Sequence, residues 1–183
     1  MEHKDNNKIL IGKLKKIANM LSKDYTVKVG ILAQNNKPID KNIDLAGIGC
    51  VQEYGADIPV TDKMRAFFRH EFGVNLKKTT TTIKTPARSW LYSPIKDSSF
   101  RKAIYDYVGD ESIIEEYGDK DIMKDLANKI GEVALFQIQR AFENNGINGE
   151  WKPNSPITIA QKKSSKPLID KGDLRRQVSY EVE

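Results

Sequence analysis

The side chains able to do covalent or metal chemistry are few and scattered along this 183-residue sequence. Cys50 is the only cysteine, which excludes an internal disulfide and favours a buried, unreactive thiol. His70 has no second histidine or cysteine at metal-ligand spacing, so it is expected on a helix surface. The sequence also lacks a glycine-rich phosphate loop and a Gly-x-Ser-x-Gly nucleophile pattern. We therefore predict no catalytic residue, no cofactor and no metal site, with a hydrolase using Cys50 or His70 as a minor alternative.

Acidic side chains gather in one stretch, at Glu115, Glu116, Asp119 and Asp121. Paired carboxylates catalyse reactions when they converge in a cleft that separates their pKa values. Here the neighbouring residues are polar, so the pattern favours a solvated acidic connector between Asp110 and Asp119.

The run from Ile58 to Leu91 instead carries residues suited to making contacts. Its arm, Asn75–Thr85, is rich in threonine and lysine and has little apolar surface, so it is expected to project from the body. Such an arm is marginal alone but becomes stable when it adds to a neighbour's sheet. Arg88 follows it, and its guanidinium suits a carboxylate within the subunit or across an interface.

The predicted subunit-interface residues are Lys77, Lys78, Thr80, Thr82, Lys84 and Arg88. An ordinary hairpin with a surface arginine is the alternative interpretation. The apolar face of the helix before the arm, with Met64, Phe67, Phe68 and Phe72, is expected to be core. Trp90, Trp151 and Leu174 are predicted to anchor the contact-making segments to the body.

Charge is uneven along the chain. Residues 1–91 carry 16 Lys/Arg and 9 Asp/Glu, whereas residues 92–146 carry 7 and 11. The basic half and the acidic middle can support head-to-tail association between copies. The alternative is that both are solvated faces. Lysines of the arm and of the stretch from Lys162 to Lys166 also allow non-specific contact with phosphate.

The elements that must position these residues follow from periodicity and capping signals. Helical spacing is found over 8–22, after Asp44 up to Gly55, after Thr61 or Asp62 up to Gly73, after Ser98 or Ser99, and from about Lys120 to Asn144. Alternation predicts strands over 25–32 and around Val178–Val182. The long helix needs a broad partner, and a sheet is the natural one.

The expected fold class is therefore α+β. A small, mainly antiparallel sheet should pack against one long helix, with a projecting β arm and short accessory helices. We expect an N-terminal amphipathic helix over residues 1–24, followed by a single domain over 25–183 whose arm projects at about 75–85. No apolar run approaches the roughly 20 residues that span a bilayer, so no membrane partner is expected. The N-terminus has no apolar core of the signal-peptide kind.

Several short motifs occur in a fixed order. They are Val29-Gly30-Ile31, then Gln52-Glu53-Tyr54-Gly55, Pro86–Leu91, Trp151-Lys152-Pro153 and Pro167–Arg175. In this order they resemble the tailed-phage neck and tail-completion proteins, also called virion morphogenesis or head–tail joining proteins. The chain departs from that pattern where Thr85 stands for Ile, Trp90 for Phe and Lys171 for Thr.

The resemblance implies a structural, non-enzymatic protein of a phage, prophage or phage-tail-like particle. Such a protein forms a ring, commonly six-fold, where DNA leaves the head and enters the tail. Its expected partners are further copies of itself, the adjoining neck, connector or tail-tube proteins, and passing duplex DNA. It is expected in the virion after assembly in the host cytoplasm. The main alternative from the residues is a DNA-binding accessory protein with a basic arm.

Overall fold

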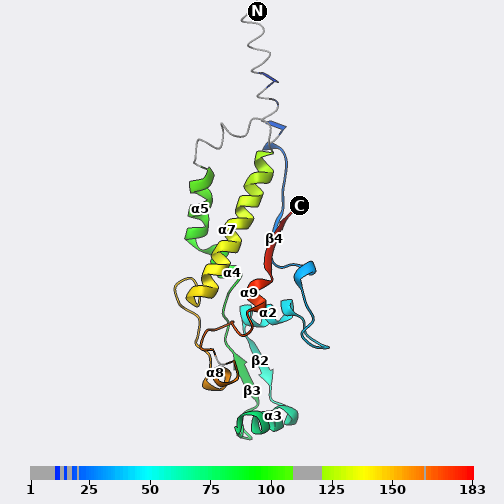
Figure 1. The fold of residues 1–183 in the computed structure, drawn as a ribbon, viewed down its shortest axis with the longest axis vertical. Helices are drawn as coiled ribbons and strands as arrows, with labels where there is room; N and C mark the ends of the chain where they lie inside the picture. Colours follow the sequence, from blue (N-terminus) through cyan, green and yellow to red (C-terminus); the bar gives the residue numbers. More distant parts are fainter. Residues whose placement is uncertain (1–10, 13–14, 16–17, 20, 109–120, 163) are drawn as a thin grey trace, which may run out of the picture.

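The molecule is elongated, with a helix-and-sheet body at one end and a hairpin projecting from the other (Figure 1). This computed structural model describes residues 11–12, 15, 18–19, 21–108, 121–162 and 164–183. The described positions between Ile11 and Leu21 are helical and exposed, and the rest of the helix expected over 8–22 lies outside the described residues. The acidic connector expected over Asp110–Asp119 also lies outside them.

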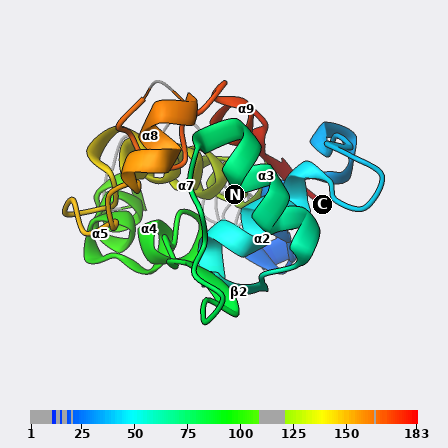
Figure 2. The same ribbon diagram turned by 90° about the horizontal axis from the view of Figure 1, so that it is seen from below.

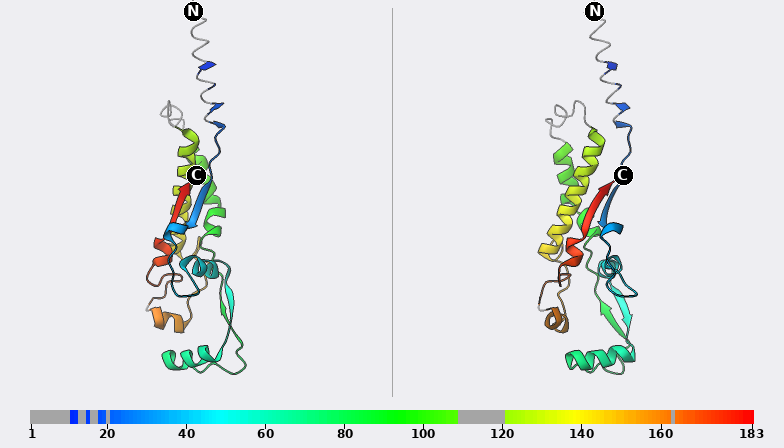
Figure 3. Two further views of the ribbon diagram at one scale, coloured as in Figure 1. Left: turned by 90° about the vertical axis from the view of Figure 1, so that its right-hand side faces the viewer. Right: turned by 45° about the vertical axis from the view of Figure 1, so that its right-hand side comes forward.

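A long helix and a two-stranded sheet form the body. Strand β1 (Val27–Ile31) pairs antiparallel with β4 (Val178–Val182), so that Val29 lies opposite Tyr180. Helix α7 (Ile122–Asn144) packs along both strands, as Figures 1 and 3 show. Its 23 residues give it a length of about 35 Å. The prediction of an α+β fold with a long helix on a small antiparallel sheet is confirmed.

Small residues on α7 allow close contact with the sheet. Ala127, Gly131, Ala134, Ile138 and Ala141 are buried at intervals of three or four residues, which is one helix face. Asp121 begins the helix by accepting the amide of Lys124, and Asn145 ends it in the left-handed conformation. These ends agree with the helix expected from about Lys120 to Asn144.

Short helices complete the body. Helix α5 (Ser98–Val108) runs beside α7, and α4 (Tyr92–Lys96) lies between β3 and α5 in the sequence (Figure 1). Helix α2 (Leu45–Tyr54) is capped by Asp44, which accepts the amide of Gly47 at 2.7 Å. A 3-10 turn (Ala33–Asn35) precedes it, and α8 (Pro156–Lys162) and α9 (Asp173–Arg176) lie in the stretch before β4.

The projecting part consists of β2, α3 and β3. Strands β2 (Ala56–Pro59) and β3 (Thr82–Thr85) pair antiparallel, with Ala56 opposite Thr85 and Pro59 opposite Thr82. Helix α3 (Asp62–Phe72) lies across the end of this two-stranded stalk (Figure 3). Thr61 caps α3 at its start, and Gly73 ends it in the left-handed conformation, as the sequence predicted.

Two expectations are wrong, one for the apolar face of α3 and one for Cys50 on α2. No side chain of α3 is buried, and Phe67 is 49% exposed, because α3 lies at the tip and away from the core. In the arm, β3 covers Thr82–Thr85, whereas residues 74–81 are irregular with a turn at Lys78 and Thr79. Cys50 is exposed, because it lies on the side of α2 that faces away from the core.

Candidate assembly surface

Three of the five sequence motifs, those containing Glu53, Arg88 and Trp151, meet where the stalk joins the body. Glu53, near the end of α2, is 7% exposed. Its carboxylate accepts the hydroxyl of Ser89 at 2.5 Å and the backbone amides of Trp90 at 2.7 Å, Leu91 at 2.9 Å and Tyr92 at 3.2 Å. These four donors surround a single carboxylate at the start of α4. Glu53 thus fixes the segment that leaves the stalk.

Aromatic side chains next to this junction pack in the hydrophobic core. Trp90 is 3% exposed and donates its indole N–H to the carbonyl of Gly49 at 2.9 Å. Phe142 lies between the two tryptophans, with ring centroids 5.9 Å from Trp90 and 5.7 Å from Trp151. Leu174 belongs to the same buried cluster. The three residues expected to anchor the chain, Trp90, Trp151 and Leu174, therefore all lie in the core.

Arg88 is buried at this junction and does not face a carboxylate. It is 6% exposed, and its Nε donates to the carbonyl of Lys152 at 2.8 Å. Its terminal nitrogens donate to the carbonyl of Pro153 and to the side-chain oxygens of Gln52 and Asn154. The predicted carboxylate partner within the subunit is therefore wrong for the described residues. Five donors in a fork allow one arginine to satisfy several oxygens here.

A second arginine organises the arm. The guanidinium of Arg65, on α3, donates to the carbonyls of Lys77 at 2.9 Å and Thr80 at 2.7 Å, and also to those of Leu76 and Lys78. The arm therefore folds back on its own helix. Nothing in the spacing of Arg65 identified this role.

The other predicted interface residues lie on the surface of the hairpin. Lys77, Lys78, Thr82 and Lys84 are exposed, and Thr80 is half-buried. The ammonium of Lys84 lies 3.8 Å from the carboxylate of Asp57 across the β2–β3 pair. Lys77 and Lys78 lie at the turn that precedes β3 in the sequence, where the amide of Thr80 donates to the carbonyl of Lys77.

A groove of about 590 Å³ separates the hairpin from the body. One wall is the aromatic face of α3, in which Phe72 lies with its ring centroid 5.6 Å from those of Phe67 and Phe68. The opposite wall includes Ile157 and Lys162 from α8. Figure 2 shows α3 and α8 together at this end of the molecule. The three phenylalanines of α3 that were expected in the core thus line a surface groove.

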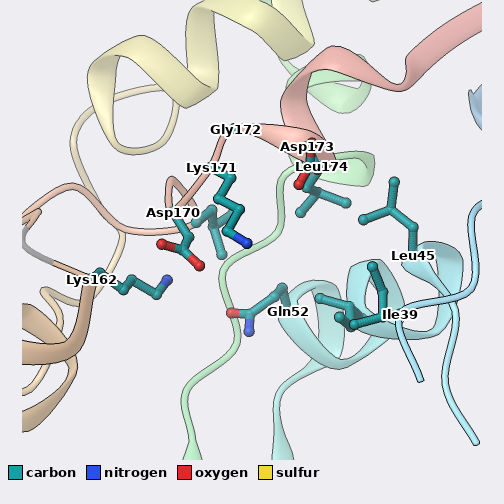
Figure 4. Close-up of a pocket in the computed structure, with 11 residues that line it drawn as sticks. Ile39, Leu45, Gln52, Lys162, Asp170, Lys171, Gly172, Asp173 and Leu174 are labelled. Carbon is teal, nitrogen blue, oxygen red and sulfur yellow. The ribbon is translucent and has the colours of Figure 1, made fainter. Parts of the chain in front are cut away.

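A smaller hollow of about 390 Å³ lies between α2, α8 and the segment leading into α9. Figure 4 shows an apolar part formed by Ile39, Leu45 and Leu174 and a polar part with Lys162, Asp170 and Lys171. Two lysines and two aspartates line it, so its charges balance. Lys162 lines both this hollow and the groove beside α3.

The candidate catalytic and metal residues are not assembled into a site. His70 is exposed, as expected, and its Nδ1 lies 2.9 Å from the carboxylate of the adjacent Glu71. Within the part of the chain that the structure describes, no three His, Cys, Asp or Glu side chains are grouped to hold a metal ion. In the same part, no helix combines the length and hydrophobicity needed to cross a membrane.

Asp121, one of the predicted connector carboxylates, has a structural role. It accepts hydrogen bonds from Lys23 at 2.5 Å and Tyr25 at 2.6 Å, and these lower its pKa to about 2. It therefore ties the start of α7 to the segment before β1.

No family model matches this chain, and neither a curated protein nor a solved structure shows significant similarity to it.

Proposed function

We propose that this chain is a structural subunit of a tailed phage, prophage or phage-tail-like particle. It assembles into a ring at the head–tail junction and joins the head to the tail. It acts by binding other copies and the adjoining neck, connector or tail-tube proteins, without catalysis. The virion is its proposed location, and the host cytoplasm is where it is assembled.

The observation that carries this proposal is the projecting β2–α3–β3 hairpin. An 11-residue helix with no buried side chain stands on a two-stranded stalk and presents a cluster of three phenylalanines to a groove. Exposed apolar surface of this kind marks sites of protein association. The hairpin thus offers a contact surface, and the body holds it in a fixed position.

The arrangement of the motifs gives further support. The motifs containing Glu53, Arg88 and Trp151 lie far apart in the sequence but bond directly to one another at the base of the stalk. A set of motifs in a fixed order supports a common function more strongly when the motifs together stabilise one structural feature. In this chain they fix the exit of the hairpin from the body, which suits a protein that works through that hairpin.

Removal of the hairpin tests the proposal. Because Ala56 and Thr85 are directly paired, residues 57–84 can be replaced by an Asn-Gly turn while Glu53, Arg88 and the aromatic core remain. We expect a folded protein by circular dichroism that no longer supports particle maturation, leaving filled heads and detached tails. Normal maturation with the shortened chain would refute the proposal.

The DNA-binding alternative rests on the exposed lysines of the hairpin, Lys63, Lys77, Lys78 and Lys84. Phosphate contacts through lysine give binding that weakens steeply with salt. A fluorescence titration of duplex DNA at several salt concentrations separates the two functions. Tight binding with a steep salt dependence, lost with Lys77→Gln and Lys78→Gln, would favour the DNA-binding protein.

A further inference from the structure

The groove between α3 and α8 carries charge of one sign. Its charged lining residues are Lys84, Arg88 and Lys162, and no carboxylate lines it among the described residues. The rest of its surface is a mixture of uncharged polar side chains and large apolar ones, the latter being Phe67, Phe68, Phe72, Leu76, Ile83 and Ile157. The hollow in Figure 4, by contrast, has two carboxylates for its two lysines. The groove therefore suits a segment that has both carboxylates and large apolar side chains.

The positive charges of Arg88 and Lys162 are only partly neutralised by carboxylates of the described residues. The guanidinium of Arg88 meets only carbonyl and amide oxygens, and burial lowers its pKa. Burial also lowers the pKa of Lys162, which the positive charge of Arg88 lowers further and the carboxylate of Asp170 raises. A carboxylate placed between Lys162 and Arg88 would stabilise the charged form of both. The groove thus favours an anionic occupant.

The sequence contains a segment of this chemistry. Residues 109–120 read GDESIIEEYGDK, with Ile113, Ile114 and Tyr117 among five carboxylates and one lysine. This segment lies outside the described residues, but its two flanks are described. Val108 ends α5 and Ile122 begins α7, at the end of the body opposite to the hairpin (Figures 1 and 3).

The segment cannot reach the groove of its own molecule. Twelve residues whose two flanks lie at one end of the body can extend at most about 20 Å from it, because even a fully extended chain spans about 3.5 Å per residue. Helix α7 alone is about 35 Å long, and α8 and α3 lie beyond its C-terminal end (Figure 1). An occupant from this chain must therefore belong to a second copy.

We propose that residues 109–120 of one copy dock in the α3–α8 groove of the next copy. Ile113, Ile114 and Tyr117 contact the phenylalanine face, and Glu115 and Glu116 approach Lys84 and Lys162. This contact rests on the self-association in the proposed function and names the two surfaces that make it. Because the surfaces differ, the contact is heterologous and generates a ring when the rotation between copies closes.

A peptide-binding experiment tests the contact directly. The probe is a fluorescein-labelled peptide of residues 109–120. The recipient is the full chain with Glu115→Lys and Glu116→Lys, whose own segment cannot fill a neighbour's groove. We expect saturable binding by fluorescence anisotropy. Adding Lys84→Glu and Lys162→Glu to the recipient should weaken binding at least about ten-fold.

The matched control is Lys77→Glu with Lys78→Glu, the same total charge change at two hairpin residues outside the groove. This control should change the affinity less than about two-fold. The milder pair Lys84→Gln and Lys162→Gln replaces the glutamate pair if the latter unfolds, as judged by circular dichroism. The proposal is overturned by absence of saturable binding up to about 1 mM, or by an equal loss of affinity in the control.

Charge-reversing substitutions on the two contact surfaces give a second, independent test of the contact. Neither the Glu115→Lys/Glu116→Lys chain nor the Lys84→Glu/Lys162→Glu chain should self-associate in light scattering. A chain with all four changes should associate again, because each reversed segment then meets a reversed groove. Wild-type association that is unchanged by both single sets would reject this contact while leaving the proposed function standing. Normal particle maturation without the hairpin would reject the function while leaving the peptide result unaffected.

Discussion

The carboxylate of Glu53 accepts the backbone amide of Trp90 at 2.7 Å, across 37 positions of sequence. The same carboxylate also accepts the amides of Leu91 and Tyr92 and the hydroxyl of Ser89. One side chain thus joins the end of α2 to the start of α4, on either side of the hairpin. The position of the hairpin relative to the body depends on this junction.

Glu53→Ala should therefore destabilise the fold strongly. Each buried donor left without a partner costs about 1–3 kcal/mol, so we expect a loss of about 3 kcal/mol or more in the free energy of unfolding. Glu53→Gln should lose less, because its amide oxygen still accepts two amides. Urea unfolding measures both. Glu71→Ala, which removes an exposed carboxylate on α3, is the control and should change stability by less than about 0.5 kcal/mol.

Arg88→Gln should also destabilise the protein, by about 2–4 kcal/mol, because it leaves the carbonyls of Lys152 and Pro153 without a donor. Arg88→Lys should not restore stability, since an ammonium cannot reproduce the fork that meets several oxygens at once. The exposed Arg101 provides the control, as Arg101→Gln should be nearly neutral. Stability unchanged by Arg88→Gln would show that the junction does not depend on the guanidinium.

The elements were largely predictable because their signals are local. Asp44, Thr61 and Gly73 have the capping roles expected from their types and spacing, and α7 follows its apolar periodicity. What could not be predicted depends on tertiary partners. The period of α3 shows that its phenylalanines share one face, but not that this face lines a surface groove. The carbonyl partners of Arg65 and Arg88 have no signature in the sequence, because any backbone supplies them.

Gly131 allows α7 to approach β4 closely. A Cβ at this position would lie 2.2 Å from the ring of Tyr180, so Gly131→Ala should cost about 1–3 kcal/mol through overpacking. The effect of Gly131→Ala on the free energy of unfolding should change from destabilising to stabilising when the Tyr180 ring is absent. In a Tyr180→Ala background, Gly131→Ala should stabilise by up to about 1 kcal/mol, through the higher helix propensity of alanine. A double-mutant cycle by urea unfolding measures this coupling, and additive effects would contradict the contact.

Asp121 should make stability depend on acid pH. Hydrogen bonds from Lys23 and Tyr25 lower its pKa from 3.8 to about 2 on folding. Because the folded pKa is the lower one, the contribution is fully present above about pH 4 and is lost as the pH falls toward 2. Asp121→Asn keeps the N-cap of α7 but removes the charge. The difference in unfolding free energy between wild type and variant should be present at pH 6 and shrink near about pH 2.5.

Asp44 and Asp97 also have pKa values lowered by hydrogen bonds, from the Gly47 amide and from Ser99 respectively. They contribute to the acid sensitivity of both proteins equally, so the comparison with Asp121→Asn isolates Asp121. A difference that stays constant across this pH range would contradict the role of the ionised carboxylate.

Arg65 should control the local order of the arm rather than global stability. Its guanidinium donates to four carbonyls between Leu76 and Thr80, and α3 makes no contribution to the core. Arg65→Ala should therefore open residues 74–81 and accelerate tryptic cleavage after Lys77 and Lys78 by about ten-fold or more, while the global free energy of unfolding changes by less than about 1 kcal/mol. Arg65→Lys should be intermediate, because one ammonium reaches fewer carbonyls. Cleavage at an unchanged rate in Arg65→Ala would mean that the turn around Lys77 and Thr80 holds the arm without help from α3.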